Sequence, residues 1–276
     1  MKILIDNYSD YSQSQPLYFH EGFKELGHQS TVFDVASSSI FDVCDTLTPE
    51  FLIMSAKRMQ SDVIEYLKQS QNIKLLINID GLNTDNIKEL TAFLKGNNIK
   101  VPFLFSSNVD LPQTVQGYKI VKVYQAADTN QVQDLHFDYQ VDKAIFINKP
   151  NQSIAYESSF HVISTEQELK DNVDIFLPCV TLRSIFTKYN EIIFKELTEV
   201  SQLFLNAIYS GTKTYYDNED DSKIKNNLNK MFKQEFNINY RDSKKITDFQ
   251  DISKVVSEKH RGNNRAKTIL SQIGGV

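Results

Sequence analysis

Short, continuous apolar runs separated by helix-like segments dominate this chain. Residues 3–5, 75–77 and 192–194 are typical, and within them polar and apolar residues do not alternate. A strand that is apolar along its whole length is buried on both faces, as in a parallel sheet covered by helices. The pattern begins at the N-terminus and begins again near residue 144, which favours two α/β domains in tandem.

The length of 276 residues also suits two domains. We expect residues 1–130 to form an N-terminal domain, residues 131–142 a polar linker, and residues 143–276 a second domain that ends in helices. The expected strands lie near residues 3–5, 31–34, 50–55, 74–79, 101–105, 119–124, 144–147, 160–163, 174–177, 191–194 and 213–216. The expected helices lie near residues 16–26, 59–69, 84–95, 198–209, 221–234, 248–259 and 261–273.

The net charge of -5 is unevenly distributed. Residues 221–276 carry twelve Lys and Arg against six Asp and Glu, so the other 220 residues carry -11. A general nucleic-acid binder needs a dominant basic surface, which disfavours that class. We interpret the basic segment as a solvated helical face, with attraction of an anion such as phosphate as the alternative.

Composition and absent motifs exclude further classes of protein. Two distant cysteines, Cys44 and Cys179, exclude a disulfide scaffold and suit a reducing compartment. No apolar run reaches the ~18 residues of a membrane span, and the N-terminus has no secretory signal, so we expect a cytoplasmic protein. The five histidines show no ligand spacing, which predicts no metal site. Glycine-rich dinucleotide and P-loop motifs are absent.

Ligands of open α/β sheets bind beyond the carboxyl ends of the strands. This rule selects the polar residues that follow the predicted strands. In the first half these are Asp6, Asn7, Ser55, Asp80 and residues 106–110; in the second they are Asn148, Lys149, Ser164, Thr165 and residues 195–201. With two such domains, the crevice between them is the expected site.

The segment TEVSQLFLNAIYSG, residues 198–211, places a predicted helix directly after a strand. The N-terminus of such a helix offers unpaired N–H groups and positive dipole charge, which suit a diphosphate. Glu199 at its start has the chemistry to accept two ribose hydroxyls. The alternative is a plain crossover helix with an acidic start, and the spacing alone favours that alternative.

Several short motifs resemble GT-B glycosyltransferases. Residues 206–212 resemble the family's E-A-x-A-x-G-T run, whose helix carries nucleotide-sugar contacts, and MKILID with LGHQSTVFD resembles its opening strand, helix and turn. The A-x-D element at residues 126–128 and the His-Arg and Arg-Ala pairs at residues 260–266 resemble the CgeB-like and phage branch.

The resemblance implies two Rossmann-like, doubly wound domains, the first on the acceptor side and the second on the nucleotide-sugar side. It implies metal-independent sugar transfer without a cofactor, from a donor that we expect to be UDP-linked. The donor contacts it implies are Thr198, Glu199, Ser201, Asn206, Ser210 and Gly211, with Lys149, Arg183 and Lys195 as candidate cations for the diphosphate.

An inverting transferase also needs a base for the acceptor's proton. Asp110 in SSNVDLP is the first candidate, since this loop resembles the D-x-x-L-P loops of phage DNA glucosyltransferases, and Asp80 is the second. The alternative for Asp110 is a carboxylate that caps the turn before Pro112.

The sequence also departs from the family. Retaining members usually carry two glutamates eight residues apart on the donor helix, where this chain has Thr198 and Asn206, and the first loop is not glycine-rich. Two other hypotheses therefore stay open: a catalytically inactive accessory or binding protein, and a phage enzyme that glycosylates DNA. The sequence does not identify the acceptor, for which a glycan, a protein and modified DNA are the candidates. A homo-oligomer and a partner transferase are the candidate assemblies.

Overall fold

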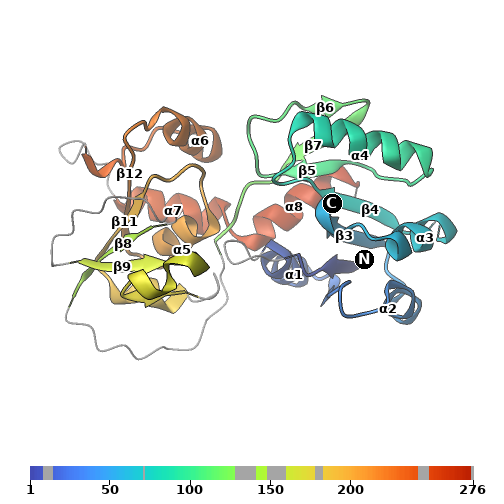
Figure 1. The fold of residues 1–276 in the computed structure, drawn as a ribbon, viewed down its shortest axis with the longest axis horizontal. Helices are drawn as coiled ribbons and strands as arrows, with labels where there is room; N and C mark the ends of the chain where they lie inside the picture. The colour runs from blue at the N-terminus through green and yellow to red at the C-terminus, as the bar shows by residue number, and fades with distance from the viewer. Residues whose placement is uncertain are drawn as a thin grey trace. The chain divides into compact units, whose positions relative to one another are not determined.

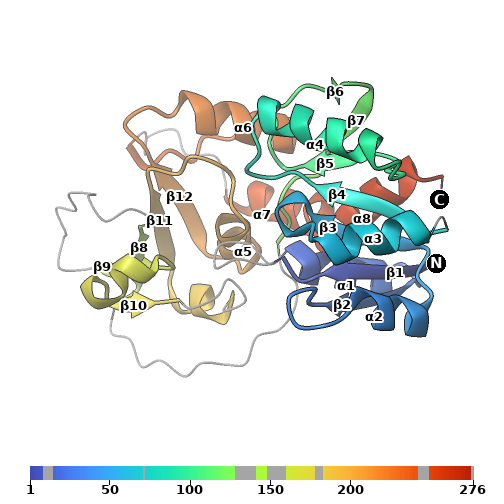
Figure 2. The ribbon, with the colours of Figure 1, turned by 45° about the vertical axis from the view of Figure 1, so that its right-hand side comes forward.

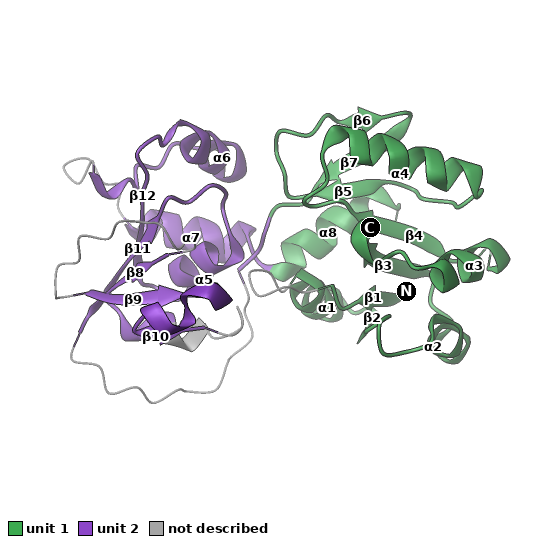
Figure 3. Ribbon diagram, in the orientation of Figure 1, with its two compact units in different colours: residues 1–8, 15–124, 262–276 green, residues 9–14, 125–261 purple. Residues whose placement is uncertain are grey.

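The computed structural model describes residues 1–8, 15–70, 72–127, 141–147, 160–177, 183–241 and 249–274, with residues 183–185 as backbone only. The chain divides into two compact units (Figure 3). Unit 1 comprises residues 1–8, 15–124 and 262–276, and unit 2 comprises residues 9–14 and 125–261.

Unit 1 is a seven-stranded sheet in the order β2-β1-β3-β4-β5-β7-β6, in which only β6 is antiparallel to its neighbour. Successive residues of the central strands β1, β3, β4 and β5 are buried, which explains the continuous apolar runs. The strands are β1 (Lys2–Asp6), β2 (Gln29–Phe33), β3 (Phe51–Ser55), β4 (Lys74–Asn78), β5 (Leu104–Ser106), β6 (Thr114–Val115) and β7 (Tyr118–Lys122).

Helices cover both faces of this sheet (Figures 1 and 2). On one face, α2 (Ile40–Leu47), α3 (Ser61–Gln69) and α4 (Thr84–Gly96) share a core with Leu52 and Ile77. On the other face, α1 (Gln15–Glu25) packs beside α8 (Gly262–Gln272), and the Phe19 ring meets the Phe105 ring at 5.8 Å. The doubly wound fold predicted from the sequence is confirmed.

Unit 2 is a five-stranded parallel sheet in the order β10-β9-β8-β11-β12. Its strands are β8 (Lys143–Phe146), β9 (Phe160–Ser164), β10 (Ile175–Phe176), β11 (Glu191–Lys195) and β12 (Lys213–Asp217). Its helical segments are η2 (Gln167–Asn172), η3 (Arg183–Lys188), α5 (Gln202–Tyr209), α6 (Ser222–Phe232) and α7 (Phe249–Lys259). The Phe194 ring of β11 packs edge-on against Phe204 of α5 at 5.2 Å.

Four details differ from the sequence-based expectations. Helix α2 and the short strand β6 were not expected. Helix α5 begins at Gln202 rather than near residue 198, because the Ser201 side chain accepts the Phe204 N–H and so starts the helix there. The domain division expected from the sequence assigned the last helix to the second domain, residues 143–276. In the structure this helix, α8, packs on α1 and belongs to unit 1. Most of the expected linker, residues 131–140, lies outside the described residues.

Two glycines allow α1 and α8 to approach closely. A Cβ on Gly22 would stand 2.5 Å from the carbonyl group of Gly262, and a Cβ on Gly262 would collide with the carbonyl oxygen of Tyr18. Both obstacles are backbone atoms that no side-chain rotation can move. The contact therefore depends on hydrogen at both Cα positions.

Replacing Gly262 with Ala tests this contact. We expect the free energy of unfolding to fall by about 2 kcal/mol, because the helices must separate to admit the methyl group. Urea denaturation followed by circular dichroism measures the change. Gly96→Ala is the matched control, since no atom lies within 4 Å of its added Cβ and the helix should be slightly more stable. Equal stability of the two variants would contradict the packing argument.

Candidate functional site

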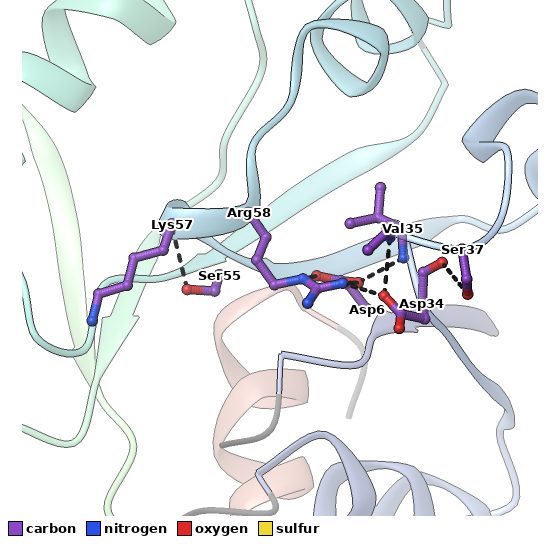
Figure 4. Close-up of polar contacts among 8 residues, drawn as sticks. Asp6, Asp34, Val35, Ser37, Ser55, Lys57 and Arg58 are labelled. Carbon is purple, nitrogen blue, oxygen red and sulfur yellow. Dashed lines mark hydrogen bonds and ion pairs between the residues drawn. The ribbon is translucent and has the colours of Figure 1, made fainter. Parts of the chain in front are cut away.

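The carboxyl edge of the unit 1 sheet carries a buried ion-pair cluster, which we call the Asp6–Arg58–Asp34 cluster. Asp6 ends β1 and is fully buried, and Arg58 ends the short helix η1 (Ala56–Arg58) after β3. Arg58 Nε donates to Asp6 Oδ2 at 2.8 Å, and Arg58 Nη2 donates to Asp6 Oδ1 at 3.2 Å and also to Asp34 Oδ1. Figure 4 shows the guanidinium between the two carboxylates. A second donor, the Val35 N–H, lies 3.1 Å from Asp6 Oδ1.

The cluster lies where the strand order reverses. The chain passes from β1 to β2 on one side and then to β3 on the other, so β1 and β3 flank the topological switch point. Ligands of doubly wound folds bind at this point. The cluster therefore occupies the position in unit 1 where a ligand is expected.

Burial and pairing set the charges of the cluster. Burial raises the pKa of Asp6, although hydrogen bonds from Val35 and Arg58 act against it. The Ala36 N–H and the Arg58 guanidinium lower the pKa of Asp34. Burial acts to lower the pKa of Arg58, but the two carboxylates outweigh it and raise that pKa. Asp34 and Arg58 thus stay charged near neutral pH.

Asp80, the second catalytic candidate, is tied into the same edge. Its Oδ1 accepts from the Ser106 hydroxyl at 2.6 Å and from the Ser107 N–H at 2.8 Å, and its Oδ2 accepts from Asn78 Nδ2 at 3.1 Å. These contacts join the ends of β4 and β5. Both oxygens of Asp80 are therefore engaged in holding the sheet edge together.

Asp110, the first catalytic candidate, is exposed in the loop after β5. Its backbone N–H donates to Asn108 Oδ1 at 2.9 Å. Lys122 fixes this loop by donating to the carbonyl oxygens of Asn108 at 2.8 Å and Leu111 at 2.6 Å. The structure thus places both candidate carboxylates at the carboxyl edge of unit 1, Asp110 accessible and Asp80 engaged.

Unit 2 carries a second ion-pair cluster at its carboxyl edge, the Lys195–Asp217–Arg241 cluster. Lys195 and Asp217 end the neighbouring strands β11 and β12. Lys195 Nζ contacts Asp217 Oδ2, and Arg241 Nε contacts Asp217 Oδ1. Burial acts to raise the pKa of Asp217, but hydrogen bonds from the two cations outweigh it and lower that pKa.

The predicted donor segment begins beside this cluster. Glu196 has a positive φ of 47°, and the next residue, Leu197, exchanges hydrogen bonds of 2.9 and 2.8 Å with the Asn218 side chain. Thr198 and Glu199 are exposed in the loop that leads to Ser201, the N-cap of α5. In this sheet β8 and β11 flank the switch point, so the N-terminus of α5 follows a strand at that point.

The remaining predicted donor residues are not gathered there. Asn206 is fully buried within α5, and its carbonyl oxygen accepts from the Ser210 hydroxyl at 2.8 Å. Ser210 and Gly211 follow the opposite end of that helix, directly before β12. Lys149 and the side chain of Arg183 lie outside the described part of the chain.

Sequence inspection missed three members of the two clusters: Asp34, Arg58 and Arg241. Asp34 is the last residue of the strand expected at residues 31–34, so it was counted with the strand and not with the polar residues that follow it. Arg58 follows β3 by three residues and directly precedes the helix expected at residues 59–69. Arg241 lies 24 residues from its partner Asp217, and no local pattern joins them.

In the described part of the chain, no group of three or more His, Cys, Asp or Glu side chains is arranged to hold a metal ion. No helix there is both long and apolar enough to cross a membrane.

Two solved structures resemble the fold of this chain over nearly its whole length. The crystal structure of SsfS6, a Streptomyces sp. SF2575 glycosyltransferase, has a TM-score of 0.53 at 10% identity, covering 98% of this chain and 99% of that one. The Anabaena protein Alr3699/HepE, in complex with UDP and glucose, has a TM-score of 0.55 at 9% identity over 100% of both chains. No protein-family profile and no curated protein sequence matches. At these identities the likeness shows the GT-B fold.

Replacing Arg58 with Met tests the buried pairing in unit 1. Asp6 would lose its cation while still buried, so we expect the free energy of unfolding to fall by about 3 kcal/mol or more. Urea denaturation measures it. Adding Asp6→Asn removes the unpaired buried charge. The free energy of unfolding should therefore fall less in the double variant than in Arg58→Met alone. A larger loss in the double variant would contradict this account.

Asp217 predicts an acid-dependent loss of stability. Its folded pKa lies below its unfolded value near 3.9, so its contribution is present above that pH and is lost as the pH falls through the folded pKa. Asp217→Asn should therefore cost about 1–3 kcal/mol at pH 7, and the difference from wild type should shrink below about pH 4. Denaturation at several pH values measures this. Asp171→Asn, an exposed position in the same unit, should show no such trend.

Proposed function

We propose that this protein is a glycosyltransferase that transfers a sugar from a nucleotide-sugar donor held by unit 2. The observation that supports it most is the GT-B fold along the whole chain, together with a helix N-terminus at the switch point of unit 2. The complex of the Anabaena protein with UDP and glucose supports a UDP-linked donor. The CgeB-like or phage branch and a cytoplasmic location are further parts of the proposal, as is activity without a metal or another cofactor.

Donor binding follows from the charges beside α5. The amides at the start of α5 and the ammonium of Lys195 act on the diphosphate, while Glu199 accepts ribose hydroxyls. Asp217 holds Lys195 at the end of β11, so the cation is positioned before the donor arrives. The side chain of Lys195 is 29% exposed and retains donors for a ligand.

Transfer then needs a base and a stabilised leaving group. In this proposal unit 1 takes the acceptor, and Asp110 accepts the proton of the attacking hydroxyl, with Asp80 as the second candidate. The hydroxyl oxygen bonds to the anomeric carbon as the bond from that carbon to the phosphate oxygen breaks. The electron pair leaves with the nucleoside diphosphate, whose charge the amides of α5 and Lys195 stabilise.

A second candidate function is donor binding without catalysis. Thr198 lies before α5 and Asn206 is fully buried within it, so neither of the two positions that carry glutamates in retaining members supplies a carboxylate. This candidate predicts that the protein binds UDP but releases none from UDP-glucose.

Calorimetric titration with UDP and UDP-glucose, followed by an assay of UDP release, tests the proposal. We expect Lys195→Met to weaken UDP binding about tenfold or more, because a charge-assisted hydrogen bond is lost. Lys213→Met is the control, since Lys213 is exposed at the amino end of β12. The absence of UDP binding would overturn the proposal, and binding without UDP release would favour the second candidate.

A further inference from the structure

One oxygen of the Asp6–Arg58–Asp34 cluster is not used inside the protein. Asp34 Oδ1 accepts from the Ala36 N–H at 2.9 Å and from Arg58, whereas Oδ2 has no hydrogen-bond partner among the described residues. The Asp34 side chain is 41% exposed. A carboxylate oxygen with an unused lone pair thus faces outward beside the switch point of unit 1.

Hydrogen bonds within the cluster fix the direction of the Asp34 carboxylate. The fully buried Asp6 binds Arg58 through two hydrogen bonds, and Arg58 in turn binds Asp34. The backbone N–H of Val35 holds Asp6, and that of Ala36 holds Asp34. A side chain held at one oxygen by two donors loses little further freedom when a ligand binds the other oxygen, which favours recognition.

A buried hydrogen-bond network and one exposed lysine add to the polar groups at this edge. Gln15 is 1% exposed, and its Oε1 accepts from Asn78 Nδ2 at 2.6 Å and Tyr8 at 2.8 Å. The Asp80 N–H donates to Asn78 Oδ1, which fixes the Asn78 amide, and Gln15 Nε2 is buried out of reach of a ligand. The exposed Lys57 side chain places its Nζ over Gly81 and has no hydrogen bond or ion pair among the described residues.

These groups match a ligand that both donates and accepts hydrogen bonds. A sugar hydroxyl does both, whereas a phosphate accepts only. The described charged residues that end or follow the strands of this edge are the carboxylates Asp6, Asp34, Asp80 and Asp110 and the cations Lys57, Arg58 and Lys122. Arg58 and Lys122 are already bound within the protein, so a polyanion would find too few cations to replace its counterions.

We infer that the acceptor substrate is an uncharged, polyhydroxylated molecule of the sugar class, and that Asp34 Oδ2 accepts a hydrogen bond from one of its hydroxyl groups. This inference rests on the proposed function, in which unit 1 takes the acceptor. It opposes a nucleic acid as the acceptor.

The experiment uses the full chain with UDP-glucose as donor. The acceptor probes are maltose, cellobiose and a 20-base-pair DNA duplex, with products identified by mass spectrometry. We expect transfer to a disaccharide and none to the duplex. Asp34→Asn keeps an oxygen for Ala36 and Arg58 but places a donor where Oδ2 stood, so KM for the disaccharide should rise about tenfold with little change in kcat.

Two further variants separate recognition from folding. Asp34→Glu keeps the charge but moves the oxygen, and KM should rise here too. Asp45→Asn makes the same charge change at an exposed position on α2 and should leave KM unaltered. Unchanged UDP affinity in all three variants would show that unit 2 is intact.

The outcomes separate the inference from the proposed function. Failure of the wild-type chain to bind UDP would defeat both. When UDP binds normally and UDP is released from UDP-glucose, transfer to the duplex, transfer to none of the probes, or an unaltered KM in Asp34→Asn would overturn the inference alone.

Discussion

Burial of the central parallel strands on both faces is the constraint that decides where polar chemistry stands in this protein. In unit 1 the middle of the sheet is closed by α2, α3 and α4 on one side and by α1 and α8 on the other. Polar side chains inside such a core would lose their water without gaining partners. The charged clusters therefore lie where strands end, at the edge that doubly wound folds use for ligands.

The carboxyl edges of the two sheets offset the free-energy cost of a buried charge in the same way. Asp6 and Asp217 each lie almost out of reach of water, and each is neutralised by cations from other segments of the chain. A buried carboxylate without a partner is strongly destabilising. Such clusters also hold their outer members still, so Asp34 and Lys195 are positioned before any ligand arrives.

The sequence predicted elements better than it predicted sites. Apolar runs are local, so nearly every strand and long helix was found, whereas α2 was missed even though Ser39 caps it at the Asp42 N–H. The start of α5 was placed too early, because Glu199 resembles an acidic first turn while Ser201 makes the capping bond. Asp6, Asp80 and Lys195 were selected by their place after strands. Their partners Arg58 and Arg241 were missed, since each comes from a distant segment.

The sequence by itself determined the doubly wound α/β class and the candidate residues at strand ends, since periodicity and order along the chain are local properties. Only the tertiary structure decided which of those residues are engaged and which face outward. Asp80 has both oxygens bound, whereas Asp34 keeps one that is unused among the described residues. It also decided that α8 returns to α1 through Gly22 and Gly262. Contacts of this kind join residues far apart in the chain, and no pattern within one segment records them.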